Sequence, residues 1–257
     1  MRICPLSSGS KGNCTFIESE NTRILIDAGL SGKKLEERLA DIDVSIESID
    51  AVLITHEHSD HVGGAGVLGR KYGLITYIHP HTHAASTKIF KGTETIKHIS
   101  GTFTLKDMTI DCVDLSHDAA HPYAFKIESD GKRCGVVTDL GVATQLVRFK
   151  MRDCHALVLE MNHDVGMLQR STKYPWDVKQ RILSNYGHLS NEAGAELFNE
   201  LVTENTKQVF LAHLSEENND PYLAKDVLYQ RNEGHPLMSE INIEIAHQHR
   251  ISQIYEF

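Results

Sequence analysis

The chain has 257 residues, of which 40% are hydrophobic and 24% charged, so it can bury one sizeable core and is not a disordered chain. Its 26 Lys and Arg residues against 35 Asp and Glu residues give a net charge of −9, which argues against a broadly basic nucleic-acid-binding protein. No run of about 18 apolar residues is present, which excludes a membrane-spanning helix. The first residues lack the apolar stretch of a secretory signal, and the five cysteines form no Cys-x-x-Cys pair. We therefore expect reduced thiols and a cytoplasmic protein.

Short apolar runs in the first half of the chain predict a series of strands. Residues 2–6 and 14–18 predict two strands around a glycine- and serine-rich loop at 7–13, which is either a hairpin turn or a backbone cradle for phosphate. Residues 22–27 and 51–55 predict buried strands, and apolar residues at helical spacing predict a helix over 31–42. Further strands are predicted at 74–78, 109–115, 123–128, 133–138, 156–160 and 208–212.

Helices are predicted mainly in the last third of the chain. Ser190 is a helix N-cap before an apolar face within 191–203, and Asp220-Pro221 opens another helix. Residues 241–246 predict a closing strand. No repeat or linker divides the chain, so we expect one domain over residues 1–257. Strands mixed with helices favour an α/β sandwich, whose strand order the periodicity leaves open.

The strongest chemical signal is a set of four potential metal ligands within six residues, directly after a predicted strand, at His56, His58, Asp60 and His61. Side chains two residues apart point to the same side of an extended segment, so the first two histidines can bind one metal ion. If a helix begins next, Asp60 and His61 can face a second ion. Imidazole and carboxylate ligands without thiolate suit zinc, manganese or iron at a hydrolytic site.

One loop cannot complete two coordination spheres, so further ligands must come from elsewhere in the chain. His117, Asp139 and His213 each follow an apolar strand-like run and precede turn-like residues. A scaffold usually exposes its functional groups at such strand ends, so we take these three side chains as candidate ligands.

A second group of histidines, at 79, 81 and 83, looks like a metal-binding tract. Pro80 interrupts it and no partner cluster is evident, so we predict a surface loop. His121 lies four residues beyond His117, and we do not expect it to be a ligand.

The ordered ligand set resembles the metallo-β-lactamase superfamily over nearly the whole chain. It consists of Asp27, His56-x-His58-x-Asp60-His61, His117, Asp139 and His213. Four further motifs resemble the YycJ (WalJ) subgroup, whose members are regarded as DNA exonucleases of the Gram-positive cytosol. These motifs are Leu6–Cys14, Asp27-Ala28-Gly29, Asn162-His163-Asp164 and Gly187–Asn191.

The resemblance implies an αββα sandwich of two mixed sheets covered by helices, with two divalent metal ions (zinc or manganese, with iron as an alternative) at one edge. It implies that His56, His58 and His117 hold the first ion, that Asp60, His61 and His213 hold the second, and that Asp139 bridges them. Asp27 would then orient a ligating imidazole by a hydrogen bond. The zinc β-lactamases carry cysteine where this chain has Asp139, which argues against antibiotic hydrolysis.

Residues outside the ligand set point to a phosphodiester substrate. His188 precedes a predicted helix, whose free backbone N–H groups would attract an anion. The Gly187–Asn191 motif also resembles the His-Ser motif of the tRNA 3′-processing branch, with one residue inserted before Ser190. We therefore expect His188 to contact the phosphate, and either His188 or a metal-bound water to protonate the leaving oxygen. We expect Asp60 to orient the attacking water. Further candidate substrate contacts are Ser8, Ser10, His163 and Asn191.

The predicted function is a dinuclear metal-dependent phosphodiesterase that digests DNA, by resemblance from 5′ to 3′. The alternatives are a small-molecule hydrolase of the same fold, acting on a cyclic phosphodiester, thioester or lactone, and a non-catalytic protein that keeps the metals for structure. The acidic net charge favours the first alternative, whereas a local basic funnel would favour DNA. The candidates for that funnel are Lys11, Lys33, Lys34, Lys88, Lys91, Arg148, Lys150, Arg152 and Arg170. A homodimer is compatible with the sequence.

Overall fold

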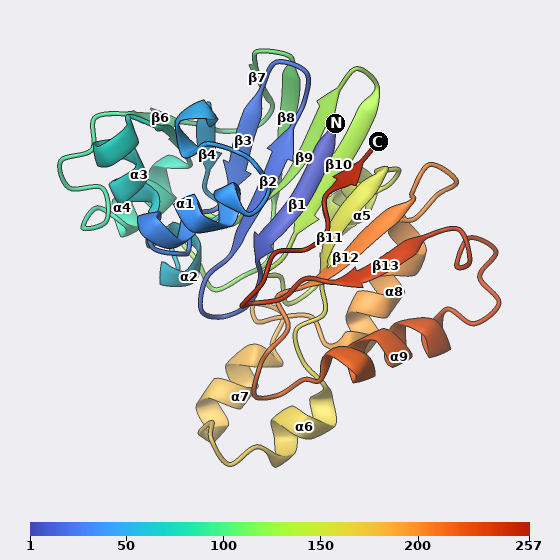
Figure 1. The fold of residues 1–257 in the computed structure, drawn as a ribbon. Helices are drawn as coiled ribbons and strands as arrows, with labels where there is room; N and C mark the ends of the chain where they lie inside the picture. The colour runs from blue at the N-terminus through green and yellow to red at the C-terminus, as the bar shows by residue number, and fades with distance from the viewer.

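A computed structural model describes residues 1–257 as two facing β-sheets with helices on both outer sides (Figure 1). Each sheet has seven strands and contains both parallel and antiparallel pairs. The first sheet has the order β14 (Tyr255–Glu256), β1 (Arg2–Ser7), β2 (Cys14–Glu18), β3 (Arg23–Ile26), β4 (Ala51–Leu53), β5 (Ile75–Ile78) and β6 (Ile96–His98). The second sheet has the order β13 (Asn242–Ile245), β12 (Gln208–Ala212), β11 (Ala156–Glu160), β10 (Lys132–Val137), β9 (Tyr123–Ser129), β8 (Met108–Asp114) and β7 (Phe103–Leu105). The predicted αββα sandwich is confirmed.

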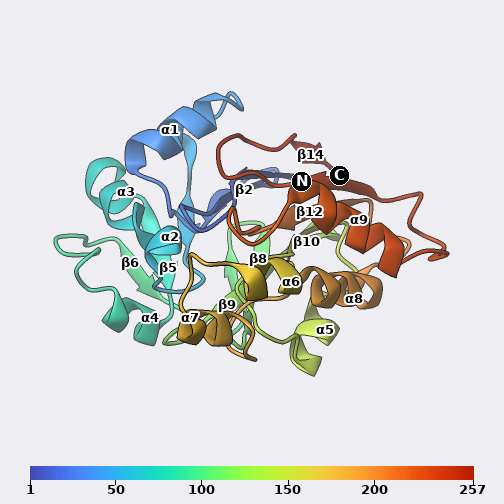
Figure 2. The same ribbon diagram turned by 90° about the horizontal axis from the view of Figure 1, so that it is seen from below.

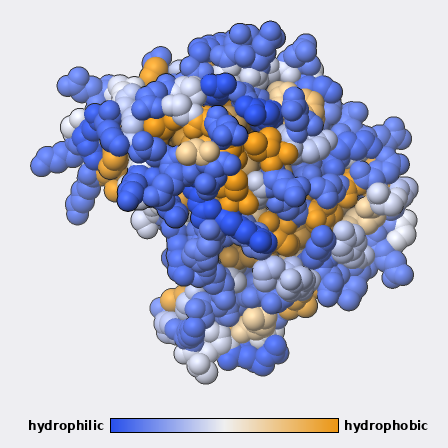
Figure 3. Space-filling view, in the orientation of Figure 1, coloured by the Kyte–Doolittle hydropathy of each residue, from blue (hydrophilic) through white to orange (hydrophobic).

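Three layers of apolar side chains hold the sandwich together. The middle layer lies between the sheets and includes Phe125 and Phe210, both fully buried. The other two layers join each sheet to its helices: Leu35 and Leu39 pack against the first sheet, and Phe198 packs against the second. Burial of this much apolar surface is the main stabilising contribution to such a fold. In Figure 3, apolar residues show over the central strands, and mostly polar residues cover the periphery.

Short helices connect the strands and cover the outer faces of the sheets. On the first sheet they are α1 (Gly32–Ala40), the 3-10 helix η1 (Ile46–Ser48), α2 (Ser59–Val62), α3 (Ala65–Tyr72) and α4 (Pro80–Ala85). The helices in the second half of the chain are α5 (Gln145–Met151), α6 (Val165–Arg170), α7 (Trp176–Ile182), α8 (Asn191–Leu201) and α9 (Pro221–Arg231). No helix is long and apolar enough to cross a membrane.

The long predicted elements are present, and none of their predicted ends moves by more than two residues. Three short strands and six short helices were not predicted: β6, β7, β14 and α2–α7. These helices have four to eight residues, which is too few for a repeating apolar face to stand out. The predicted surface loop at 79–83 is wrong, because Pro80 occupies the first position of α4 and His79 caps it. His79 also has a partner that the sequence did not reveal, since its ring stacks on His121 at 3.7 Å between centroids.

Strands β4, β10, β11 and β12 end at the lower edge of the sandwich in Figure 1, which Figure 2 views directly. A segment that we call the arm, residues 164–187, projects from this edge and contains α6 and α7. The strand ends and the arm together frame the candidate site.

Candidate metal centre

His56, His58 and His117 form one group of converging imidazoles. The Nε2 atom of His56 lies 3.0 Å from Nδ1 of His58, and Nε2 of His117 lies 3.3 Å from the same atom. Oxygen atoms fix two of the rings from behind, because His117 Nδ1 is 2.9 Å from the Gly187 carbonyl and His56 Nδ1 is 2.9 Å from Thr55 Oγ1. Burial, together with the neighbouring histidines, lowers the pKa of His56. A neutral imidazole of this kind is able to bind a metal ion.

Asp60, His61 and His213 form a second group beside the first. The Oδ2 atom of Asp60 lies 3.4 Å from His61 Nε2 and 3.5 Å from His213 Nε2. Burial raises the pKa of the Asp60 carboxyl, but the neighbouring His213 and His61 imidazoles outweigh burial and hold that pKa below its usual value. Asp60 is therefore a carboxylate, available as an anionic ligand.

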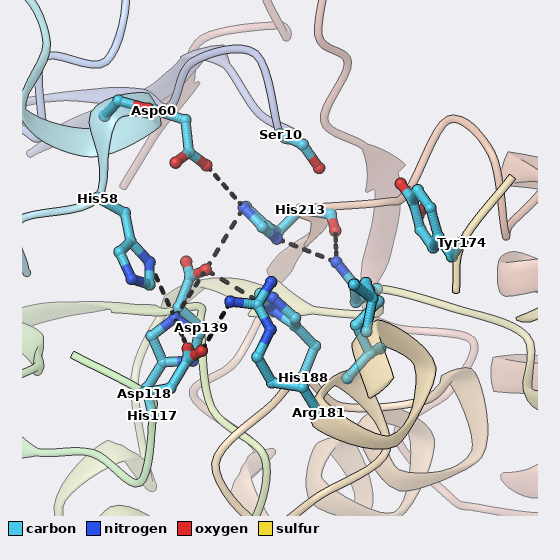
Figure 4. Close-up of a pocket in the computed structure, with 15 residues that line it drawn as sticks. Ser10, His58, Asp60, His117, Asp118, Asp139, Tyr174, Arg181, His188 and His213 are labelled. Atoms are coloured by element: carbon cyan, nitrogen blue, oxygen red, sulfur yellow. Dashed lines mark hydrogen bonds and ion pairs between the residues drawn. The ribbon is translucent and has the colours of Figure 1, made fainter. Parts of the chain in front are cut away.

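Asp139 faces both groups (Figure 4). Its Oδ2 atom is 3.2 Å from His61 Nε2, and its Oδ1 atom is 3.5 Å from His213 Nε2 and 3.9 Å from His117 Nε2. Burial raises the pKa of this carboxyl, but the three surrounding histidines, His213, His61 and His117, outweigh burial and hold the pKa below its ordinary value. One buried carboxylate thus contacts members of both histidine groups.

The donor atoms of the two groups fit a divalent metal ion. Asp139 Oδ2 and His213 Nε2 are buried and have no hydrogen-bond partner. A buried polar atom without a partner destabilises the fold, because its lost hydration is not replaced. A bound cation would replace that hydration for both atoms. Imidazole nitrogens and carboxylate oxygens are suitable ligands for zinc and manganese.

Asp27 holds His61 from the side away from the cavity. Its Oδ2 atom lies 2.8 Å from His61 Nδ1, and the backbone N–H of Thr55 donates to Oδ1 at 2.8 Å. Asp27, Asp139 and His213 have φ values of 63°, 63° and 54°, in the left-handed region that non-glycine residues seldom occupy. Each lies one or two residues beyond a strand end, where the abrupt turn aims its side chain at the cluster.

Gly29 lets the Asp27 loop pack against the histidine loop. A Cβ atom at this position would lie 1.7 Å from the Asp60 carbonyl oxygen, which is backbone and cannot rotate away. We predict that Gly29→Ala lowers the free energy of unfolding by about 1–3 kcal/mol or more, because the two loops must move apart to make room for the added methyl group. Denaturant titration measures the effect. Gly32→Ala is the matched control, since its Cβ would meet only side-chain atoms, of which the nearest is Cγ1 of Val67 at 3.0 Å. Equal stability of the two variants would contradict this account of the packing.

Glu160 is a functional candidate that the sequence analysis missed. It is fully buried at the end of β11, and its Oε1 atom lies 2.8 Å from Nδ1 of His188. Its Oε2 atom accepts hydrogen bonds from the backbone N–H groups of Leu189 and Leu140. Burial raises the pKa of Glu160, but His188 and His213 outweigh burial and hold it well below normal. The carboxylate therefore fixes one side of the His188 ring and leaves Nε2 for the cavity. Glu160 was missed because it is the last residue of the strand at 156–160, whereas the rule that selected Asp139 and His213 takes residues that follow a strand.

Only one of the four candidate substrate contacts lines the cavity. Ser10 is exposed and lines the cavity, whereas Ser8, His163 and Asn191 are buried and do not line it. The hydroxyl of Ser8 accepts a hydrogen bond from the backbone N–H of His213, and Asn191 bonds to Asn219. The polar atoms of these three residues face the interior, so the structure does not bring them to the cavity as substrate contacts.

Three of the N–H groups expected to form an anion site at the start of α8 have acceptors within the protein. The Leu189 N–H donates to Glu160, the Asn191 N–H to the His163 carbonyl, and the Ala193 N–H to the Ser190 hydroxyl. These donors are therefore committed to the protein itself. Of the Gly187–Asn191 motif, only His188 lines the cavity, and 19% of its side chain is exposed.

His163 has no hydrogen-bond partner for either ring nitrogen, and burial lowers its pKa to about 4. Between pH 6.5 and 4 the unfolded chain binds more protons at this residue than the folded chain, so stability falls as pH falls. From pH 7 to pH 4.5, with EDTA present, we predict that the wild type loses roughly 2–3 kcal/mol more stability than His163→Leu. Urea titrations at both pH values measure the difference, and parallel losses would contradict it.

The two groups open into a cavity of about 420 Å³. None of the nine basic residues proposed from the sequence lines this cavity; the one that does is Arg181 of α7, which pairs with Asp118 at 3.0 Å. Arg148 and Arg152 line a different cavity, beside α5. Arg181 was missed because its segment shows no clear periodicity.

Comparison with known proteins places the chain in a family. Residues 8–145 match the model of the metallo-beta-lactamase superfamily. Exodeoxyribonuclease WalJ of Streptococcus pneumoniae is 43% identical over 225 residues, covering 85% of this chain and 83% of that protein. Exodeoxyribonuclease YycJ of Bacillus anthracis is 37% identical, covering 86% and 84%. The chain belongs to the metallo-β-lactamase superfamily, in the family of WalJ and YycJ.

Solved structures of the superfamily share the fold at low identity. The Bacillus subtilis protein YhfI matches with a TM-score of 0.72 and 16% identity, covering 99% of both chains. The short form of human tRNase Z matches with a TM-score of 0.67 and 14% identity, covering all of both chains. Superfamily membership and the clustered His and Asp side chains are together consistent with divalent metal binding.

Proposed function

We propose that this protein is a metal-dependent exodeoxyribonuclease that binds two divalent ions, zinc or manganese. The observation that carries the proposal is the position of Asp139 between two separate groups of ligand atoms. The names of the WalJ and YycJ relatives support DNA as the substrate and digestion from an end. By the same family resemblance we propose 5′ to 3′ polarity.

Each ion has its own set of side chains in this proposal. His56, His58 and His117 would hold one ion and Asp60, His61 and His213 the other, with Asp139 shared. Bound divalent ions lower the pKa of water from 15.7 towards about 7 and neutralise negative charge on phosphate oxygens.

The remaining residues position groups and move protons. Asp60 is partly exposed to the cavity, with 21% of its side chain accessible, so it can accept a hydrogen bond from the attacking water and orient it. His188 faces the same cavity and can donate a proton from Nε2 to the leaving 3′ oxygen. Glu160 keeps the opposite nitrogen of that ring protonated and fixed in direction.

We also propose that the protein works in the cytoplasm. Its five cysteines are free, which fits a reducing compartment.

End-labelled DNA tests the proposed function. The metal-loaded protein is incubated with single-stranded and duplex DNA carrying the label at either the 5′ or the 3′ end. We expect mononucleotides to accumulate, released first from the 5′ end, and chelator to stop the reaction. Intact DNA, together with cleavage of small phosphodiesters, thioesters or lactones, would replace the proposal with the small-molecule hydrolase.

A further inference from the structure

The arm forms one wall of the cavity, opposite the candidate ligands. Tyr174, Val178, Arg181 and Ile182 line the cavity together with His58, Asp60 and His188. Figure 4 shows Tyr174 on one side of the cavity and the Arg181 guanidinium beside Asp118, with which it forms an ion pair. A substrate in the cavity must therefore lie between the arm and the ligand groups.

The arm differs in charge from the rest of the chain. It contains four basic residues and two acidic ones, although the whole protein has a net charge of −9. Lys179 is buried and its Nζ donates to the Gln169 carbonyl at 2.9 Å, so it stabilises the arm itself. Arg181 is different, because 60% of its side chain is exposed and its one ion-pair partner, Asp118, is itself in the cavity. The guanidinium can therefore exchange a carboxylate for a phosphate, for which its planar donors are suited.

The arm also carries three aromatic side chains, of which Tyr174 lines the same cavity as Arg181. Trp176 and Tyr186 are each 62% exposed, and Tyr174 is half-buried in the cavity wall. An aromatic ring and a cationic group on one wall of the cavity, with two exposed rings elsewhere on the same arm, match the pattern by which proteins bind single-stranded nucleic acid. A base presents a flat face to such a ring only when it is unpaired. The cavity, at about 420 Å³, has the size of a small-molecule site and not of a groove for a duplex.

We propose that the arm is a clamp for the single-stranded end of DNA. Bases next to the scissile phosphate stack on Tyr174 and Trp176, and Arg181 leaves Asp118 to bind a backbone phosphate. A blunt duplex must fray before its end can enter. This inference rests on the proposed nuclease function and adds the form of DNA that the site accepts.

Trp176 provides the readout, because it is the only tryptophan of the chain. The His188→Ala protein with bound metal, which slows digestion, is titrated with a ten-nucleotide thymidine strand and with a blunt duplex while indole fluorescence is recorded. We expect the single strand to quench the fluorescence at much lower concentration than the duplex. Tyr174→Ala and Arg181→Ala should each weaken binding by roughly tenfold or more. Phe149→Ala is the matched control, because Phe149 is 78% exposed and lines only a separate cavity beside α5.

The outcomes separate this inference from the proposed function. A wild-type protein that digests DNA while the strand leaves the indole unquenched would retain the nuclease and overturn the clamp. Equal binding of the strand and the duplex, or equal effects of the Tyr174 and Phe149 substitutions, would also overturn it. Failure of the wild type to digest any DNA would instead overturn the proposed function.

Discussion

Replacement of Asp139 by alanine should reduce DNA cleavage by at least about 100-fold. Loss of groups that merely support metal ligands typically costs 10–100-fold, and Asp139 contacts both ligand groups directly. The variant should also retain fewer ions, measured by elemental analysis after purification without chelator. Initial rates on end-labelled DNA at matched protein concentration give the loss in activity.

Two further variants make this result interpretable. Asp139→Asn keeps the volume of the buried side chain and removes its charge, so we expect a similar loss without a packing defect. Asp226→Ala removes an exposed carboxylate from α9 and should leave the rate unchanged. If Asp139→Ala binds two ions and retains near wild-type turnover, Asp139 does not bridge them.

Replacement of His188 by alanine should slow DNA cleavage by roughly 10²–10⁴-fold, which is the range for a general acid. His188 is outside both ligand groups as we assign them, so metal content should stay unchanged. A nitrophenyl phosphodiester should be affected much less, because its leaving group hardly needs a proton. Kinetics on both substrates therefore distinguish proton donation from positioning, for which the two losses would be equal.

Glu160→Gln tests the same proton path from the other side. The amide keeps the size of the side chain but no longer holds the His188 ring as a carboxylate does. We expect the DNA cleavage rate to fall and its pH profile to shift, with metal content unchanged. An unaltered pH profile would limit Glu160 to a packing role.

The scaffold was predictable because its signals are local. Apolar strand runs, the turn between β9 and β10 and the caps at Ser190 and Asp220 each act over a few residues. The His56–His61 loop follows the same logic, since its ligand spacing is contained in one segment. Its partners His117, Asp139 and His213 were recognised because each follows a strand end.

The unpredicted part of the site depends on tertiary contacts. Glu160 reads as the last residue of a buried strand, and only the fold places its carboxylate against His188. The N–H groups of Leu189 and Asn191 appear free in the sequence, whereas the fold supplies acceptors for them. Arg181 reaches the cavity because the arm folds back over it, which no periodicity in the segment indicates.

Anomalous X-ray scattering from crystals grown with manganese tests the dinuclear centre most directly. The account predicts two peaks per chain, one among His56, His58 and His117 and one among Asp60, His61 and His213, with Asp139 between them. A single peak, or peaks away from these side chains, would contradict it.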